Sequence, residues 1–319
     1  MAISVRSFAK INLGLAIGPR RADGFHALRT VYQTIALHDV VRVDLQRGTG
    51  IEIRCKDPRV PADETNTCWR IAERVLRSLK TRGKLVISIE KQLPVQGGIG
   101  AASSNAIATM LGLERVLGCA LEPEERLRMA AEVGSDLPLF LIGGTVLGCG
   151  RGEEVFPLED LPPINLVVVT PPIGVSTPQA FADWDAQFGL TPPDGSSTMN
   201  RFSRSAFAWL TARLPSGVPT ASGDRAETPL LDLVRAGIEN DFERVVFPKH
   251  PELREVKRVL ERAGARYASL SGSGSTVYGL FDTADEAQRA AAHIGDSGVP
   301  AFATATLTRK RYWQEIFAF

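Results

Sequence analysis

The segment LPVQGGIGAASSNAIA, residues 93–108, has the residue types and spacing of an anion-binding turn. Its three glycines let backbone N–H groups converge and approach a ligand closely. Ser103 and Ser104 follow where a helix is predicted to begin, so hydroxyls, free amide groups and the positive end of the helix point to one place. We therefore predict a phosphate site here. The alternative is an ordinary glycine turn with a serine cap.

This segment differs from two other phosphate-binding patterns. A P-loop requires G-K-[ST] after its glycines, and no such tripeptide follows. The dinucleotide pattern G-x-G-x-x-G is matched at Gly98 and Gly100, but Ser103 stands where the third glycine belongs. The segment therefore predicts phosphate binding of another kind.

A second glycine turn, LSGSGST at 270–276, lies between two predicted strands. By itself it is equally well explained as a tight hairpin connection. Taken together with the first turn, it becomes a candidate anion clamp on the opposite wall of a cleft between two domains.

Two charged residues stand alone in apolar surroundings. Lys10 lies in FAKINLGLAIG, inside a predicted strand, and Asp136 lies in GSDLPLF, directly after a predicted helix end at Gly134. A buried charge costs free energy unless it has a partner. We predict that Lys10 and Asp136 form such a pair, and the alternative for Asp136 is a helix cap or a structural salt bridge.

The elements that must position these residues follow from hydrophobic periodicity and turn signals. In the first half of the chain, the sequence predicts strands at 3–17, 31–45, 85–94 and 164–170 and a hairpin at 144–158. It predicts helices at 66–79, from 103 onward and at 123–133. The second half predicts helices at 241–263 and 283–294 and strands at 266–271, 276–281 and 299–307. Residues 190–228, with a short helical pattern at 202–214, are expected to form an extended loop or insertion. The whole pattern is typical of an α+β protein with a small antiparallel sheet covered by helices.

The composition of the 319-residue chain limits its partners. Lys and Arg total 37 against 36 Asp and Glu, so no overall field attracts nucleic acid or an anionic membrane. The four cysteines show no C-x-x-C spacing, which argues against a zinc site or a disulfide framework. The apolar runs are too short or too rich in glycine to span a bilayer. We expect a cytoplasmic protein that binds neither nucleic acid nor a membrane.

Three motifs together resemble those of the GHMP kinases, which are named for galactose, homoserine, mevalonate and phosphomevalonate. They are residues 94–106, GSDLP at 134–138 and LSGSGS at 270–275. The opening AKINLGLAIGPRRADGFHAL at 9–28 is more specific than any single glycine loop. The resemblance implies an α+β two-domain GHMP kinase fold. Residues 1–160 would form an N-terminal α/β domain like domain 2 of ribosomal protein S5, and residues 161–319 a ferredoxin-like C-terminal domain with an insertion around 190–228.

The resemblance also implies phosphoryl transfer from ATP to a hydroxyl of a cytidine-diphosphate-linked polyol. By that analogy Lys10 and Asp136 are the catalytic pair, with Asp136 either accepting the hydroxyl proton or only orienting the hydroxyl. The implied phosphate-binding residues are Pro94, Gly97, Gly98, Ile99, Gly100, Ala101, Ala102, Ser103 and Ser104, with Asn66 near the adenine. The implied substrate residues are Asn12, Phe25, His26 and Phe181 around the cytidine and Thr177 near the acceptor. Magnesium would be carried by the nucleotide, since no dedicated carboxylate cluster is evident.

The sequence departs from the family pattern in its glycine loop, where Gln96, Ala101 and Ala102 replace residues that are usually glycine. Two added methyl groups change the space near the phosphates, although alanine favours the helix that follows. The remaining alternatives are a homoserine- or mevalonate-type kinase, a catalytically silent nucleotide-binding module and a dinucleotide oxidoreductase. The DGFH segment and the presence of both Lys10 and Asp136 argue against them. The oligomeric state is not readable from the sequence.

Overall fold

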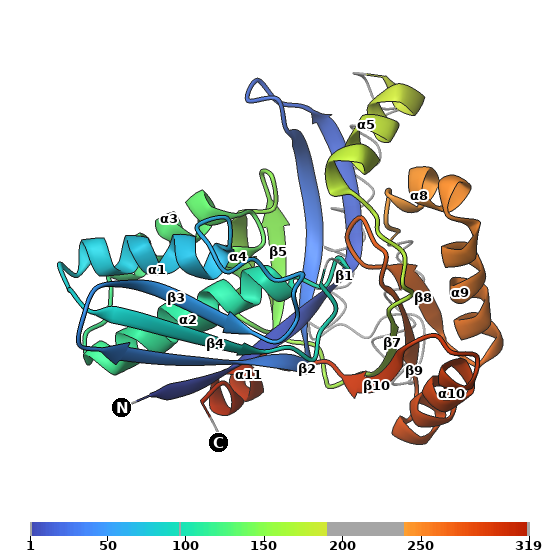
Figure 1. The fold of residues 1–319 in the computed structure, drawn as a ribbon. Coiled ribbons are helices and arrows are strands. Elements are labelled where there is room, and N and C mark those ends of the chain that lie inside the picture. The colour runs from blue at the N-terminus through green and yellow to red at the C-terminus, as the bar shows by residue number, and fades with distance from the viewer. Residues whose placement is uncertain (1, 96, 190–238, 318–319) are drawn as a thin grey trace, which may run out of the picture.

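The computed structural model describes residues 2–95, 97–189 and 239–317, which form two α/β layers joined by a long hairpin (Figure 1). The predicted loop at 190–228, with its helical pattern at 202–214, lies outside the described residues. Within the described part, no helix is long and apolar enough to cross a membrane.

The first layer is a six-stranded sheet in which β3–β4–β2–β5–β6 are neighbours and β1 pairs with β2. The strands are β1 (Ile3–Arg20), β2 (His26–Gln46), β3 (Gly50–Cys55), β4 (Lys84–Glu90), β5 (Thr145–Cys149) and β6 (Glu154–Pro157). All pairs are antiparallel except β3 with β4. The β1–β2 register places Lys10 opposite Thr34 and Asn12 opposite Tyr32. Polar side chains from both strands are thereby set into the middle of the molecule.

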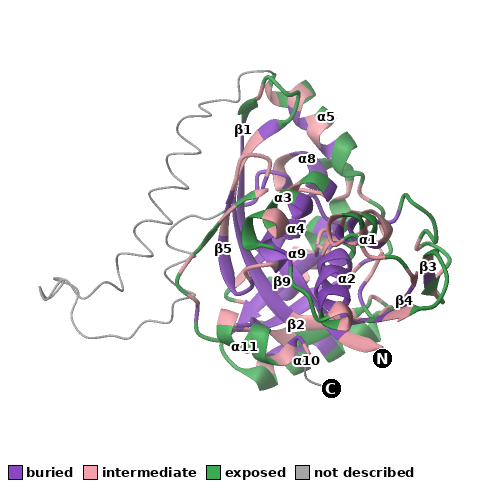
Figure 2. Ribbon diagram, turned by 90° about the vertical axis from the view of Figure 1, so that its left-hand side faces the viewer, coloured by how far each residue is buried: buried purple, intermediate pink, exposed green. Residues whose placement is uncertain are grey.

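Helices pack around this sheet on the left of Figure 1. They are α1 (Thr67–Ser78), α2 (Ala101–Leu117), α3 (Pro123–Val133), the four-residue α4 (Leu137–Phe140) and the C-terminal α11 (Arg309–Glu315). The side chain of Asn66 caps α1 by accepting from the Cys68 amide, and α3 begins at Pro123 and ends before Gly134, as the sequence predicts. Most of α2 is buried, and it runs through the interior in Figure 2.

The second layer is an antiparallel sheet with the order β10–β7–β9–β8. Its strands are β7 (Asn165–Val169), β8 (Tyr267–Leu270), β9 (Val277–Phe281) and β10 (Ala301–Ala305), and its helices are α5 (Thr177–Phe188), α8 (Glu243–Lys249), α9 (Pro251–Arg262) and α10 (Ala284–Asp296). Chain order within the described elements is strand, helices, two strands, helix, strand, which is the ferredoxin-like arrangement. The predicted α+β fold class is confirmed.

Three apolar clusters hold the layers together, and β1 contributes to each of them. Phe8 belongs to the N-terminal core, Ile11 packs with residues of the second sheet, and Ile17 belongs to the C-terminal core. Tyr312 of α11 packs back into the N-terminal core, although it follows the last strand of the second sheet. A division at residue 160 stays a prediction, because the hairpin and α11 both pack across it.

Two expected elements need correction, and several observed elements were not expected. Residues 241–263 form two helices, because Pro251 opens a new helix after His250 leaves helical geometry. The strand predicted to reach residue 94 ends at Glu90, and the chain then turns into the glycine loop. Strand β3 and helices α4, α5 and α11 were not predicted.

Candidate active site

The glycine loop lies between β4 and α2, and its described residues are 94, 95 and 97–100. Its glycines pack tightly against their neighbours. Gly98 has a φ of +76°, and a Cβ built on it would lie 2.1 Å from the Ser271 carbonyl oxygen. Gly100 has a φ of +72°, and its Cβ would lie 2.9 Å from Phe140 Cζ and 3.0 Å from Lys10 Cγ. Both positions therefore require glycine for backbone conformation and for space.

The first turn of α2 lacks the serine cap that the alternative interpretation of this segment expects. Gly100 is the N-cap residue, and among the described residues no side chain caps this helix. Ser103 is partly exposed, whereas the Ser104 hydroxyl is buried and accepts a hydrogen bond from Ser7 at 2.8 Å. The first amide groups of a helix lack intrahelical partners, so they remain suited to an anion. Of the two serines, only Ser103 offers its side chain to a ligand.

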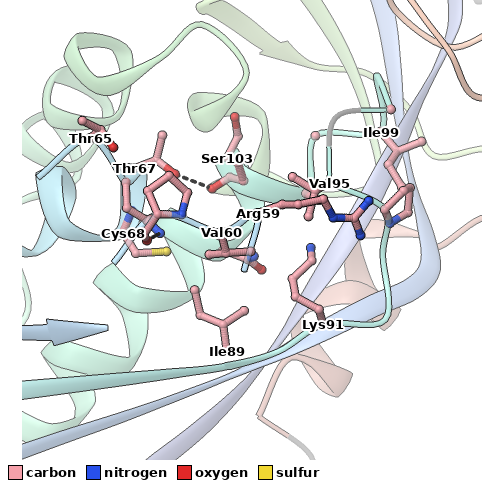
Figure 3. A pocket seen from close by; sticks show the side chains of 18 of the residues that line it. Arg59, Val60, Thr65, Thr67, Cys68, Ile89, Lys91, Val95, Ile99 and Ser103 are labelled. Carbon is pink, nitrogen blue, oxygen red and sulfur yellow. Dashed lines mark hydrogen bonds between the residues drawn. The ribbon is translucent and has the colours of Figure 1, made fainter. Parts of the chain in front are cut away.

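Beside the loop lies a cavity of about 370 Å³ (Figure 3). It is lined by most of the residues predicted to bind the nucleotide: Asn66, Pro94, Gly97, Gly98, Ile99, Gly100, Ala101, Ala102 and Ser103. Ser104 is not part of the lining. The structure thus brings together Asn66 and the glycine loop, which are about thirty positions apart in the chain.

The lining also includes residues that were not predicted to bind the nucleotide, among them Arg59, Cys68 and Lys91. Figure 3 shows Lys91 and Arg59 on the same side of the cavity, with Cys68 on the other. Lys91 Nζ lies 2.5 Å from Asp39 Oδ2, and the fully buried Asp39 also accepts from the Leu93 amide at 2.8 Å. Asp39 therefore holds both Lys91 and the start of the glycine loop. A lysine inside the strand predicted at 85–94, shortly before the glycines of the loop, was the available signal.

The second glycine loop, residues 270–276, contacts the first directly. The Thr276 amide donates to the Gly97 carbonyl at 3.1 Å, and the Ser271 hydroxyl donates to the Gly98 carbonyl at 3.0 Å. The expectation that the two loops face each other across a cleft is wrong at this point. The contact explains why glycine is needed at position 98.

Lys10 and Asp136 lie close together, as predicted. Lys10 Nζ is 3.4 Å from Asp136 Oδ2 and donates to Asn12 Oδ1 at 2.6 Å and to the Gly98 carbonyl at 2.8 Å. The Lys10 side chain is only 3% exposed, so these acceptors compensate a buried cation. Asp136, by contrast, is 33% exposed, although its neighbours Leu137 and Leu139 are fully buried. The carboxylate faces the open side of the site.

Asn12 and Thr177 are each fixed by a polar contact. Asn12 donates through Nδ2 to the Thr30 hydroxyl at 2.7 Å, which orients its oxygen toward Lys10. The hydroxyls of Thr177, the first residue of α5, and Ser273 are 2.7 Å apart. Thr177 therefore lies against the second glycine loop, on the C-terminal side of the site.

His26, Phe181 and Asp185 form a cluster at the far end of the β1–β2 hairpin. The His26 and Phe181 rings are parallel within 6°, with centroids 5.3 Å apart. His26 Nδ1 lies 3.0 Å from the Gly18 carbonyl, and Nε2 lies 2.9 Å from Asp185 Oδ1 without hydrogen-bond alignment. The sequence predicted Phe25 as the stacking partner of Phe181, whereas in the structure one face of Phe181 is covered by His26.

Phe25 itself is 53% exposed, and the Arg151 guanidinium lies 4.9 Å from its ring centroid. A cation over an aromatic face is favourable at such a distance. The predicted sandwich of a base between Phe25 and Phe181 stays a prediction.

A glycine loop at a helix N-terminus, a lysine bonded to that loop and an adjacent carboxylate are the parts of a small-molecule kinase of the GHMP class. The family descriptions "GHMP kinases N terminal domain" and "GHMP kinases C terminal" match residues 66–144 and 227–299. The 4-diphosphocytidyl-2-C-methyl-D-erythritol kinase of Solibacter usitatus is 36% identical over 308 residues, covering 97% of this chain and 90% of that protein. The chain belongs to the family of 4-diphosphocytidyl-2-C-methyl-D-erythritol kinases.

Other relatives agree with this assignment. The enzyme of that name from Moorella thermoacetica is 33% identical and covers 96% of this chain and 99% of its own. A crystal structure of 4-(cytidine 5'-diphospho)-2C-methyl-D-erythritol kinase is 29% identical, with a TM-score of 0.73 over 95% of this chain and 98% of that one. A homoserine kinase from Cytophaga hutchinsonii has the same TM-score of 0.73 at 20% identity, covering 96% of this chain and 95% of its own, which shows a shared fold.

Proposed function

We propose that this chain transfers the γ-phosphoryl group of ATP to the 2-hydroxyl of 4-diphosphocytidyl-2-C-methyl-D-erythritol, a step of the non-mevalonate isoprenoid pathway. The observation that carries the proposal is the position of Lys10. Its amino group bonds the Gly98 carbonyl of the glycine loop and also faces Asp136. A phosphate held by the loop would thus lie near the carboxylate that acts on the acceptor.

The roles of the residues follow from what phosphoryl transfer requires, which is alignment and neutralisation of charge rather than covalent catalysis. The acceptor oxygen attacks the γ-phosphorus, the bond to the bridging oxygen breaks, and ADP leaves. Asp136 accepts the hydroxyl proton, and Lys10 draws the acceptor oxygen and the γ-phosphate into line. The glycine loop and the amide groups of the first turn of α2 hold the triphosphate.

The nucleotide is proposed to lie in the cavity beside the glycine loop. Asn66 and the glycine loop both line it, which suits an adenine near Asn66 and phosphates at the loop. Lys91 and Arg59 also line the cavity, each beside its own carboxylate partner, Asp39 and Asp57. Such a cavity volume is in the range of small-ligand sites.

Magnesium is proposed to arrive bound to the β- and γ-phosphates, where it supplies counter-charge. Asp136, the carboxylate of the site, already has Lys10 and Tyr32 as neighbours. Among residues 2–95, 97–189 and 239–317, no three or more His, Cys, Asp or Glu side chains gather as a metal site.

The substrate cytidine is proposed to contact Asn12, Phe25, His26 and Phe181, with Thr177 near the acceptor. His26 and Phe181 offer an imidazole and an aromatic ring within one cluster, which suits a base that both stacks and hydrogen-bonds.

All four cysteines are free thiols, which suits the reducing cytoplasm in which we propose the enzyme acts.

The test is an assay of ADP release with three acceptors: 4-diphosphocytidyl-2-C-methyl-D-erythritol, homoserine and mevalonate. We expect kcat/KM for the cytidine substrate to exceed the other two by roughly 100-fold or more, because a site built to bond polar groups discriminates against ligands that lack them. Efficient use of homoserine or mevalonate would contradict the proposed substrate and leave only the broader kinase class.

A further inference from the structure

A tyrosine on β2, Tyr32, contacts the proposed catalytic carboxylate. Its hydroxyl donates to Asp136 Oδ1 at 3.0 Å, while Lys10 Nζ faces the other oxygen, Oδ2, at 3.4 Å. Lys10 Nζ also lies 5.5 Å from the centroid of the Tyr32 ring. Each oxygen of the Asp136 carboxylate therefore has its own neighbour, Tyr32 or Lys10, and these two side chains also lie close to each other.

Tyr32 is held on a rigid part of the molecule. It is 2% exposed, and its Cα pairs with Asn12 on β1 and with Val146 on β5. Gly148 and Gly152 leave space for the Tyr32 side chain. A Cβ on Gly148 would lie 2.4 Å from Tyr32 Cε2, and a Cβ on Gly152 would lie 2.4 Å from the Tyr32 hydroxyl oxygen. The Tyr32 ring and hydroxyl occupy the space left by the absence of side chains at these two glycines.

Asp136, by contrast, lies in the short connection between α3 and α4. It occupies the N-cap position of the four-residue α4, but its side chain makes no capping hydrogen bond. With 33% of the side chain exposed, burial alone does not select one rotamer. The orientation of the carboxylate must come from side-chain contacts, and Tyr32 supplies a directional one.

The protonation state of Tyr32 agrees with a donor role. Burial raises the pKa of the Tyr32 hydroxyl well above its ordinary value, and the neighbouring Asp136 carboxylate raises it further. The hydroxyl therefore keeps its proton at physiological pH. A hydrogen bond from a neutral donor to a carboxylate is among the stronger kinds.

We propose that Tyr32 is a positioning residue that holds Asp136 through Oδ1, so that Oδ2 stays between Lys10 and the acceptor hydroxyl. The inference rests on the proposed function, because it assigns Asp136 the role of proton acceptor. Tyr32 touches neither reacting atom in this arrangement. It acts by limiting the rotation of the carboxylate, and geometry of this kind affects turnover more than binding.

The test compares Tyr32→Phe with a matched control, Tyr312→Phe. Tyr312 is also a buried tyrosine, and its hydroxyl donates to the Phe140 carbonyl at the other end of α4, at 2.7 Å. Tyr32→Phe should lower kcat about tenfold, since the bond to a charged group is lost, and leave both KM values within about twofold. Tyr312→Phe should leave kcat within about twofold of the wild type.

A double-mutant cycle then tests whether Tyr32 acts through Asp136. In an Asp136→Ala background, measured by single turnover with enzyme in excess, adding Tyr32→Phe should change the rate by less than about twofold. A tenfold fall in that background overturns the proposal, as does a kcat for Tyr32→Phe equal to that of Tyr312→Phe. A parallel rise of both KM values with a lower Tm indicates a structural role and overturns it too.

The cycle also separates this inference from the proposed substrate. If the wild type uses homoserine or mevalonate efficiently, the substrate assignment fails, and the same cycle run with that acceptor still decides the role of Tyr32. No turnover with any of the three acceptors would overturn both.

Discussion

Replacing Asp136 by asparagine removes one charge from the site and keeps the shape of the side chain. The amide oxygen can still accept from Tyr32, and Lys10 keeps its hydrogen bonds to Asn12 and to the Gly98 carbonyl at 2.6 and 2.8 Å. What is lost is the carboxylate proposed to accept the proton and a charge 3.4 Å from Lys10. The site should therefore persist without its proposed general base.

The structure indicates that the loss in catalysis exceeds the loss in stability. The carboxylate is 33% exposed, and ion pairs with an exposed partner contribute about 1 kcal/mol or less to the free energy of unfolding. A general base contributes about 10²-fold or more in rate, which corresponds to about 2.7 kcal/mol in activation free energy. We expect kcat to fall by about 10²-fold or more, while Tm falls by no more than about 3 °C.

The assay measures ADP release at saturating ATP and cytidine substrate, with Tm measured in parallel. Asp282→Asn is the matched control, because Asp282 is 31% exposed and pairs with Arg266 at 2.7 Å, as a surface ion pair of the second domain. The KM for ATP should stay unchanged in both variants, since neither residue lines the nucleotide cavity. A kcat for Asp136→Asn within about fivefold of the control would refute the assignment of Asp136 as proton acceptor.

Three further predictions concern other parts of the site. Gly98→Ala adds a methyl group 2.1 Å from a backbone oxygen of the second glycine loop, so the first glycine loop, proposed to bind phosphate, must move by roughly 1 Å. The value of kcat/KM for ATP should then fall about 10²-fold, and a value within threefold of wild type would contradict the packing described. Phe181→Ala should raise KM for the cytidine substrate about tenfold more than Phe188→Ala does. Phe188→Ala is the control, because it removes a ring from the same helix and the same apolar cluster. Equal effects of the two substitutions would indicate that the Phe181 ring has a purely structural role. Burial raises the pKa of the Cys68 thiol to about 12, so at pH 8 only about one part in 10⁴ of this thiol is thiolate. Iodoacetamide should therefore label the exposed Cys119 but not Cys68, as measured by mass spectrometry. Equal labelling of both cysteines would contradict this prediction.

Much of the local structure could be predicted because its determinants lie within a few residues. The apolar positions of 66–79 repeat at helical spacing and Asn66 supplies a cap, and both features act within α1 itself. Pro123 and Gly134 bound α3 for the same reason. The break between α8 and α9 was also encoded locally, by Pro251, and treating 241–263 as one helix overlooked it.

Elements that depend on distant partners were harder to predict. Strand β3 is short and pairs in parallel with β4 across an intervening helix, so its stability comes from a neighbour about thirty residues away. Helix α11 packs into the N-terminal core through Tyr312, a contact that no periodicity in 309–315 indicates. Such elements are determined by packing rather than by propensity.

The candidate active site also combines features that the local sequence determines with features that depend on distant contacts. The residue types of the glycine loop, Lys10 and Asp136 determined which chemistry the chain could do, because a phosphate needs amide groups and positive charge and an acceptor hydroxyl needs a base. Which atoms meet was decided by tertiary structure. Tyr32 reaches Asp136 across 104 positions only because β2 lies between β1 and β5 and two glycines leave room for its ring. Ser104 turns inward to Ser7 and Ser103 faces the cavity, because adjacent positions on a helix point in different directions and only the packed sheet decides which is buried.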